Sequence, residues 1–198
     1  MNVAAEIFAR RHRLTVTDFL RMGSTGILGE DARVELIDGD LIDMAPIGSR
    51  HAAMVGRLTH LFVQAASDRA IVWVQNPVFL DEHTLPQPDV ALLRPRADSY
   101  SSAHPRAEDV LLIIEVAETT LAYDAQVKLP LYARAGIPEA WLIDLEHGRI
   151  TRYSVPRRGA YTRTELVSLA KVDLLALPGV SVDLSTLPIR EDRSGGDP

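Results

Sequence analysis

The stretch VLLIIEVA, residues 110–117, decides the fold class and raises the main question about function. A continuous apolar run of this length is typical of a strand that is buried at the centre of a sheet. Glu115 stands inside the run, and an ionised carboxylate taken out of water costs several kcal/mol unless something compensates it. The sequence must therefore supply Glu115 with a cationic partner, a metal ion or an open strand end.

Apolar patterns on both sides of this stretch predict more strands and two helices. The expected strands are 71–80, bent near Asn76-Pro77, then 87–93, 110–117, 139–145, and a hairpin of 148–155 with 160–166. Helical periodicity covers 49–68, with Ser49 as the candidate N-cap, and 119–136, which ends at a glycine and is kinked or restarted at Pro130. Strands and helices in this order predict an α/β fold with a mixed central sheet flanked by helices.

An extension precedes this core. The first 30 residues are expected to be a small helical segment, with a helix over 15–22. Two alternating runs in 33–44 flank Asp38-Gly39, a strong signal for a two-residue hairpin turn that places Glu35 opposite Ile42. We expect one domain over residues 1–190 and a disordered tail over 191–198.

The composition excludes several classes of protein. The chain of 198 residues has no cysteine, which excludes disulfides, thiolate zinc sites and a cysteine nucleophile. Its apolar runs are too short for a membrane span, and its N-terminal arginines follow an apolar segment, the wrong order for a secretory signal, so we expect a cytoplasmic protein. A net charge of −6 argues against nucleic-acid binding through a mainly basic surface, but it does not exclude a nuclease with an acidic metal site.

Three residues together suggest a chemistry. Asp89 begins one strand, Glu115 lies near the C-terminal end of the central strand, and Lys128 follows on a helix that can pack over it. Asp124, Lys128 and Tyr132 are spaced by four and share a face if this helix is continuous. Mg²⁺ takes one or two carboxylates together with waters and a substrate phosphate, and a nearby lysine can stabilise charge that builds on the phosphate. The pattern therefore predicts metal-assisted hydrolysis.

Each candidate also has a structural interpretation, and the residues alone leave both open. Glu115 could reach solvent or cap the next helix, Asp89 could be a turn residue, and Lys128 could be solvated. Glu35 is either a further acidic contact at the site or the solvent side of an edge hairpin. His51 is either an auxiliary contact to phosphate or water, or an ordinary polar residue in a first helical turn.

At this point the sequence resembles the PD-(D/E)xK nuclease superfamily, through PD at 88–89, EVA at 115–117 and the downstream Lys128. More closely, it is similar to a bacterial family of restriction-endonuclease-like proteins that was long a domain of unknown function. The resemblance covers about residues 14–187, and its segments are ELIDGDLIDMAP (35–46), SRHAAMVGRL (49–58), QPDVALL (87–93), LIIEVAETTLAYDAQVKLPLYARAGIPEAWLIDL (112–145) and GAY (159–161).

The resemblance implies a restriction-endonuclease-like core, a divalent metal such as Mg²⁺ or Mn²⁺, and hydrolysis of phosphodiester bonds. We expect a nucleic-acid substrate and favour DNA, but the sequence does not decide between DNA and RNA. Carried over by position, Asp89 and Glu115 would be metal ligands, Lys128 the catalytic lysine and Glu35 the additional acidic residue of the hairpin. The sequence departs from the superfamily at Ala117, where the usual lysine stands two positions after the glutamate. Lys128 would replace that lysine from the helix.

Two other functions stay open. One is a catalytically weak or inactive nuclease fold that serves as a nucleic-acid-binding or regulatory module, which the acidic charge and Ala117 favour. The other is a metal-dependent hydrolase of a small phosphorylated substrate. A homodimer would suit a nuclease that cuts both strands of a duplex, but the sequence does not decide it.

Overall fold

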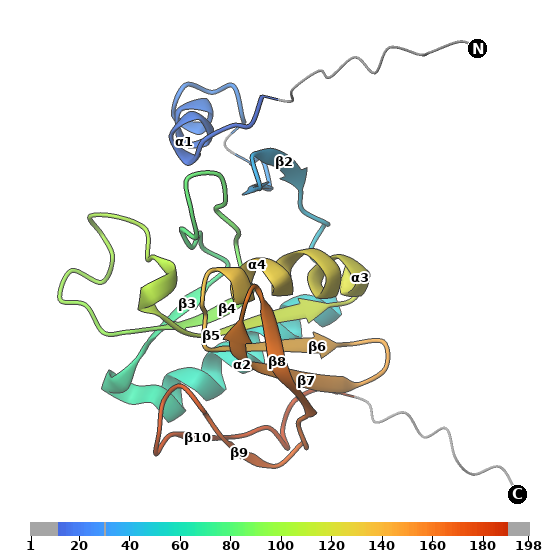
Figure 1. Ribbon diagram of the computed structural model, residues 1–198. Coiled ribbons are helices and arrows are strands. Elements are labelled where there is room, and N and C mark those ends of the chain that lie inside the picture. Colours follow the sequence, from blue (N-terminus) through green and yellow to red (C-terminus); the bar gives the residue numbers. More distant parts are fainter. Residues whose placement is uncertain (1–11, 30, 190–198) are drawn as a thin grey trace, which may run out of the picture.

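The computed structural model describes residues 12–29 and 31–189, and in these residues the central sheet has six strands (Figure 1). The strand order is β3-β4-β5-β6-β7-β8. The bounds are β3 Ile71–Val74, β4 Val90–Leu93, β5 Val110–Ala117, β6 Glu139–Asp144, β7 Arg149–Arg157 and β8 Ala160–Leu166. β5 and β6 are parallel and the other neighbouring pairs are antiparallel, which confirms the predicted mixed sheet.

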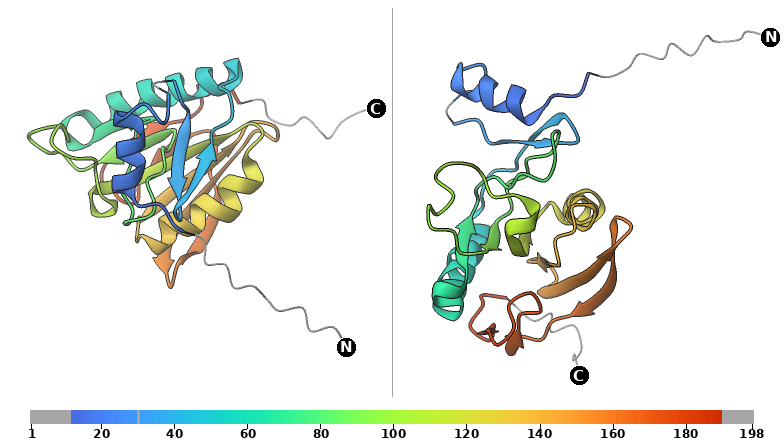
Figure 2. Two further views of the ribbon diagram at one scale, coloured as in Figure 1. Left: turned by 90° about the horizontal axis from the view of Figure 1, so that it is seen from above. Right: turned by 60° about the vertical axis from the view of Figure 1, so that its left-hand side comes forward.

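β5 has the predicted bounds, and all eight of its residues are buried. Its side chains alternate between the two faces of the sheet, as the pleat of a strand requires. Leu112 and Ile114 pack in one hydrophobic cluster with helix α2 (Ser49–Ala66), whereas Ile113 and Ala117 pack in a second cluster with helix α4 (Leu129–Arg134). By this alternation Glu115 faces the α4 side. Figure 2 shows the two helical layers on opposite sides of the sheet.

The predicted helix over 119–136 has three parts. They are α3 (Leu121–Tyr123), a π-helical turn η3 (Asp124–Lys128), and α4. In the π-helical turn the amide of Leu129 donates to the carbonyl oxygen of Asp124, five residues earlier. Pro130 gives a physical reason, because proline has no amide hydrogen and its ring crowds the carbonyl group four residues before it. Gly136, at φ 81°, lies just beyond the end of α4, as predicted.

The N-terminal segment forms a layer above one end of the sheet (Figure 2, right). Helix α1 (Val16–Ser24) is capped by Thr15, and strands β1 (Val34–Ile37) and β2 (Asp40–Asp43) form the predicted hairpin. Asp38 and Gly39 have φ of 49° and 86°, as the tight turn needs, and Glu35 pairs with Ile42. A third hydrophobic cluster joins this layer to the core through Leu36 and Leu85, which also share a backbone hydrogen bond of 2.8 Å.

Some predicted element boundaries were wrong. Gly48, not Ser49, is the N-cap of α2, and it makes no side-chain capping bond. The strand predicted over 71–80 ends at Val74, because Gln75 has a φ of 50°, and the strand predicted from residue 87 begins at Val90. Asp89 therefore lies in a bend immediately before β4 and not within the strand.

The sequence analysis did not predict the C-terminal pair β9 (Lys171–Asp173) and β10 (Ser181–Asp183), or the short 3₁₀ turns η1 (Ser67–Arg69) and η2 (Ala107–Asp109). Glu139 ties the C-terminal segment to the sheet. Its buried carboxylate accepts the indole N–H of Trp141 at 2.8 Å and the backbone N–H groups of Leu175 and Ala176 at 2.9 and 3.2 Å. These bonds compensate a carboxylate that would otherwise be costly to bury.

Within the described residues, no helix has the length and apolar character needed to cross a membrane. The expected disordered tail (191–198) lies outside the described residues, as does the part of the N-terminal extension before residue 12.

Candidate active site

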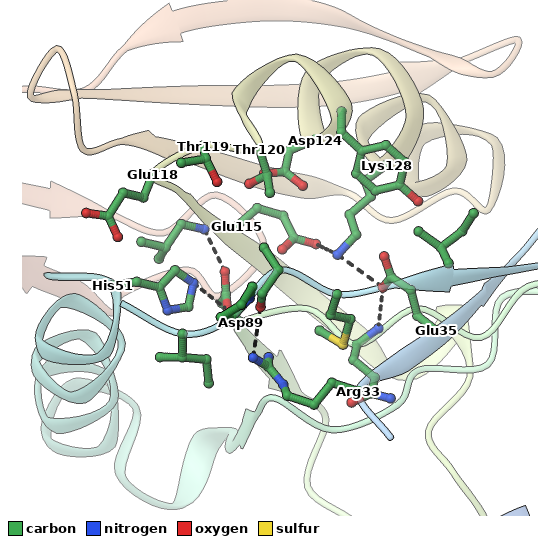
Figure 3. Close-up of a pocket in the computed structure, with 18 of the residues that line it drawn as sticks. Arg33, Glu35, His51, Asp89, Glu115, Glu118, Thr119, Thr120, Asp124 and Lys128 are labelled. Carbon is green, nitrogen blue, oxygen red and sulfur yellow. Dashed lines mark hydrogen bonds and ion pairs between the residues drawn. The ribbon is translucent and has the colours of Figure 1, made fainter. Parts of the chain in front are cut away.

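The two carboxylates predicted as metal ligands lie together where β4 begins and β5 ends (Figure 3). Val90 pairs with Ile114 in the antiparallel ladder, so Asp89 follows in register beside Glu115. The Oδ2 atom of Asp89 accepts the backbone N–H of Val116 at 2.9 Å, which fixes the aspartate against the end of β5. The turn interpretation of Asp89 is correct for its backbone, but its side chain points to the site.

Lys128 joins the sheet to the N-terminal hairpin. Its Nζ atom lies 3.2 Å from Oε2 of Glu35 and 3.3 Å from Oε1 of Glu115. Only 6% of the lysine side chain and 3% of each glutamate side chain are exposed, so Lys128 is not a solvated helix residue. Glu35 faces the site and not the solvent. Lys128 reaches this position because the helix after β5 packs over the face on which Glu115 lies.

Tyr132 makes a further contact that the sequence analysis did not assign. Its hydroxyl group donates to Oε1 of Glu115, the oxygen that Lys128 also approaches. The other oxygen, Oε2, makes no hydrogen bond or ion pair with the described residues. The spacing of four between Lys128 and Tyr132 was the available sequence signal, and both residues do face Glu115. One oxygen of the carboxylate is thereby held while the other stays open toward the pocket.

The electrostatics of the site are dominated by buried acidic groups. Burial raises the pKa of Glu115 well above its usual value, although the charge of Lys128 opposes the rise. Burial also raises the pKa of Asp124. Burial alone would lower the pKa of Lys128, but Glu115, Glu35, Asp124 and Asp89 raise it above its usual value, so Lys128 keeps its charge. Within the described residues, these four carboxylates surround the single buried ammonium group of Lys128.

His51 lies in the first turn of α2 and contacts Asp89. Its Nε2 atom is 3.0 Å from Oδ1 of Asp89, and this hydrogen bond raises the pKa of the imidazole despite its partial burial. The Nδ1 atom of His51 is buried and has no hydrogen-bond partner among the described residues. The structure thus places this auxiliary residue at the site and shows that its direct contact is with a proposed metal ligand.

These groups line a pocket of about 510 Å³ between the hairpin and the core. The core side contributes His51, Asp89, Glu115, Asp124 and Lys128, together with Thr119, Thr120 and Tyr123, and the hairpin contributes Glu35. The opposite wall is the end of the hairpin and the segment that follows it. Its apolar residues are Ile42, Met44, Ala45, Pro46 and Ile47, and Arg33 and Asp43 are its other charged residues beside Glu35. The sequence analysis did not predict this wall, because it depends on how the hairpin packs over the sheet.

The donor set fits a divalent cation. Asp89 and Glu115 offer hard carboxylate oxygens at a site where acidic side chains outnumber the buried ammonium group, and Oε2 of Glu115 is open to the pocket. Among the described residues no group of three His, Cys, Asp or Glu side chains is arranged to hold a metal ion. The protein would therefore supply two ligands and water the rest, an arrangement that suits Mg²⁺, which takes one or two carboxylates and retains several waters.

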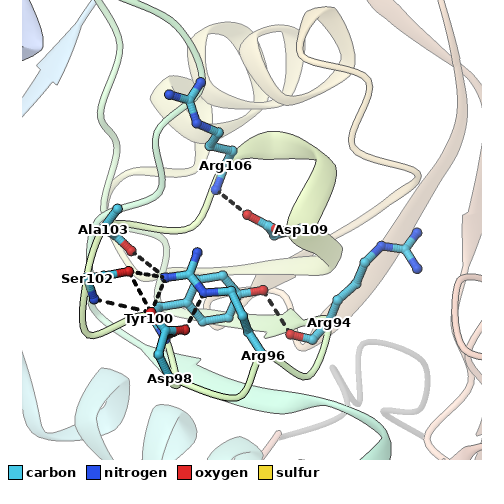
Figure 4. A network of polar contacts seen from close by, with 8 residues as sticks. All are labelled: Arg94, Arg96, Asp98, Tyr100, Ser102, Ala103, Arg106 and Asp109. Atoms are coloured by element: carbon cyan, nitrogen blue, oxygen red, sulfur yellow. Dashed lines mark hydrogen bonds and ion pairs between the residues drawn. The ribbon is translucent and has the colours of Figure 1, made fainter.

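A second network of charged groups lies in the loop between β4 and β5, at the opposite end of β5 from Glu115 (Figure 4). Asp98 receives hydrogen bonds from Arg96 at 2.5 Å and from the hydroxyl group of Ser102 at 2.6 Å. Arg96 also lies over the ring of Tyr100, 4.0 Å from its centroid. These groups satisfy one another, so the network explains the shape of the loop and offers no open donor set.

Comparison with known proteins agrees with the fold and the resemblance. The sequence profile of the Uma2 family, described as "Putative restriction endonuclease", matches residues 16–187. The crystal structure of "a putative nuclease belonging to DUF820" from Anabaena variabilis is similar with a TM-score of 0.69 at 17% sequence identity, over 88% of this chain and 97% of that chain. At this identity the likeness shows the shared fold alone. No curated protein matches the chain. Since the profile covers most of the sequence, the chain belongs to the Uma2 family, whose description is "Putative restriction endonuclease".

Proposed function

We propose that this protein is a metal-dependent endonuclease that hydrolyses phosphodiester bonds of DNA, with Mg²⁺ or Mn²⁺ bound by Asp89 and Glu115. The observation that carries the proposal is the environment of Glu115. Tyr132 and Lys128 hold one of its oxygens, and the other is open to a pocket that Asp89 also lines. Such an arrangement leaves a buried carboxylate ready to bind a cation, and the description of the family supports a nuclease reaction.

In the proposed hydrolysis the residues of the site would have separate roles. A bound divalent ion would neutralise phosphate charge and lower the pKa of a coordinated water. Asp89 and Glu115 would hold that ion, and the bonds from Val116 and His51 keep Asp89 in place. The ammonium group of Lys128 lies at the floor of the pocket, where it would stabilise negative charge on the phosphate in the transition state. Glu35 orients Lys128 through its ion pair.

A nuclease assay with matched variants tests this proposal. The purified protein is incubated with labelled DNA in Mg²⁺, Mn²⁺ or chelator, beside Asp89→Asn and Lys128→Met. Asp68→Asn and Lys171→Met are the controls, because both residues are exposed and lie outside the pocket. We expect metal-dependent cutting that both site variants lose and both controls keep. Cutting that survives Asp89→Asn, or that persists in chelator, would contradict the proposal.

A second candidate function is a non-catalytic nucleic-acid-binding or regulatory module. The observation that favours it is Ala117, which stands where the nuclease superfamily has its usual lysine. Thermal unfolding with and without Mn²⁺ separates the two candidates, because a ligand that binds the native state must stabilise it. A melting temperature that Mn²⁺ raises in the wild type but not in Asp89→Asn favours the nuclease, and indifference to Mn²⁺ favours the module.

A further inference from the structure

The groups proposed to act on the phosphate lie at the floor of the pocket and not on an open surface. Lys128, Glu35 and Glu115 are almost completely buried, and the hairpin stands over the sheet on the other side of the pocket (Figure 3). A phosphate can reach Lys128 only by entering between the two walls. The nucleotides on either side of that phosphate must enter with it or bend sharply at the mouth.

The size of the pocket limits what can enter. Its volume of about 510 Å³ is in the range of sites that hold one small molecule, roughly 300–1,000 Å³. A duplex is far larger, since its major groove alone is about 12 Å wide. In a duplex each phosphate is flanked by stacked, paired nucleotides that cannot follow it into such a space. A single unstacked nucleotide can follow its phosphate into the pocket.

The apolar wall suits the remainder of such a nucleotide. Ile47 is one of the large hydrophobic residues on the surface of the described chain, with 44% of its area exposed, and it lines the pocket beside Pro46 and Met44. Exposed apolar surface next to a charged floor is typical of a site for a ligand with both characters. A nucleotide has a charged phosphate and a base with apolar faces, which match the floor and the wall respectively.

The charges at the mouth of the pocket do not form a track for a duplex. Duplex binding relies on several lysine or arginine contacts to phosphates. Here Arg33 donates to the backbone oxygen of Ala45 at 2.9 Å, and Arg50 donates to that of Leu145 at 2.7 Å. Arg50 also lies 3.7 Å from Glu118, an acidic residue of the pocket. These contacts hold both arginines against the protein, and Glu118 offsets the charge of Arg50.

From this geometry we propose, resting on the nuclease function above, that the substrate unit is an unpaired nucleotide. Its phosphate reaches the floor at Lys128 and its base lies against the wall at Met44, Pro46 and Ile47. The protein cuts single strands and unpaired positions within a duplex, and it cuts fully paired DNA slowly because the nucleotide must first leave the stack.

Three DNA substrates of one sequence test the proposal: a single strand, a full duplex, and a duplex with a central bulge, each assayed in Mn²⁺ with wild type and Asp89→Asn. We expect the single strand and the bulge to be cut at least about ten times faster than the duplex, the rate factor of ~1.4 kcal/mol, since flipping a paired nucleotide costs a few kcal/mol. Cutting in the bulged duplex should map to the bulge. Equal cutting of duplex and single strand, lost in Asp89→Asn, would overturn the inference and leave the nuclease function standing. No metal-dependent cutting of any substrate would overturn both.

A pair of variants tests the role of the apolar wall. Ile47→Ser removes an exposed side chain that lines the pocket, and Val63→Ser removes one that is 53% exposed on α2 and lies outside the pocket. We expect Ile47→Ser to raise KM for the single strand severalfold with kcat little changed, and Val63→Ser to change neither. An unchanged KM in Ile47→Ser would overturn the placement of the base on this wall.

Discussion

Replacing Tyr132 with phenylalanine removes one oxygen atom from the floor of the pocket and isolates the contribution of its hydroxyl group to Glu115. The hydroxyl group is a buried donor to a carboxylate, and such bonds contribute about 1.5–3 kcal/mol to stability. Glu115 keeps Lys128 as a partner after the change. We therefore expect a loss of about 2 kcal/mol in the free energy of unfolding, near the lower half of that range.

The pH dependence of this loss has a definite sign. The folded-state pKa of Glu115 is raised, so its contribution to stability is greatest below its unfolded pKa and is lost as the pH rises through its folded pKa. The bond from Tyr132 opposes that rise. Without the bond the penalty for an ionised Glu115 grows, so the variant should lose more stability at pH 8 than at pH 5.

Urea unfolding followed by circular dichroism measures both effects, with Tyr161→Phe as the matched control. The hydroxyl group of Tyr161 donates at 3.0 Å to the neutral backbone oxygen of Ile137, a bond that contributes about 0.5–1.5 kcal/mol. A cost for Tyr132→Phe that is no larger than that of Tyr161→Phe at pH 8, or one that does not depend on pH, would refute the view that this hydroxyl group supports a buried carboxylate.

Three other changes have expected outcomes. Lys128→Met should cost about 3–5 kcal/mol in urea unfolding at pH 8, since it leaves buried carboxylates without their cation. The cost should be smaller at pH 5, because burial raises the pKa of Glu115 and so favours its protonated form. Glu139→Gln should weaken the fall in stability between pH 5 and pH 8. Burial raises the pKa of Glu139, so the stability that Glu139 contributes is lost as the pH rises through its folded-state pKa. An unchanged dependence of stability on pH would contradict this. Asp98→Asn should speed limited proteolysis within the loop of Figure 4, because Arg96 loses its charged partner, and should leave Mn²⁺ binding unchanged.

The core of the fold could be predicted because its elements have strong local patterns. The run over 110–117 gave β5 its bounds, and Asp38-Gly39 specified both the hairpin turn and the pairing of Glu35 with Ile42. The element boundaries that were predicted wrongly depend on single backbone angles. Gln75 ends β3 with a positive φ that neither propensity nor periodicity indicates. The pair β9 and β10 has only three residues in each strand, too few for alternation to stand out.

The candidate site could be predicted in its members but not in its contacts. Spacing and strand position singled out Asp89, Glu115 and Lys128, which the structure brings to one pocket. The bridge from Lys128 to Glu35 depends on how the hairpin packs on the core, and sequence left that residue undecided. Tyr132 was visible only as a member of a helix face, because an aromatic residue at helical spacing is most often part of the core. Tyr132 has both roles in the structure: its ring packs in the core cluster under α4, and its hydroxyl group lies at the site.

The ion pairs at the floor of the pocket set an order for the assembly of the chain. Glu35, Asp89 and Glu115 all precede Lys128 in the sequence, so during synthesis the three carboxylates leave the ribosome before Lys128, the buried lysine that pairs with two of them. A nascent chain that ends before residue 128 can pair β4 with β5, but it must keep this end of the sheet hydrated or protonated. Closure of the hairpin over the sheet thus awaits the helix that follows β5.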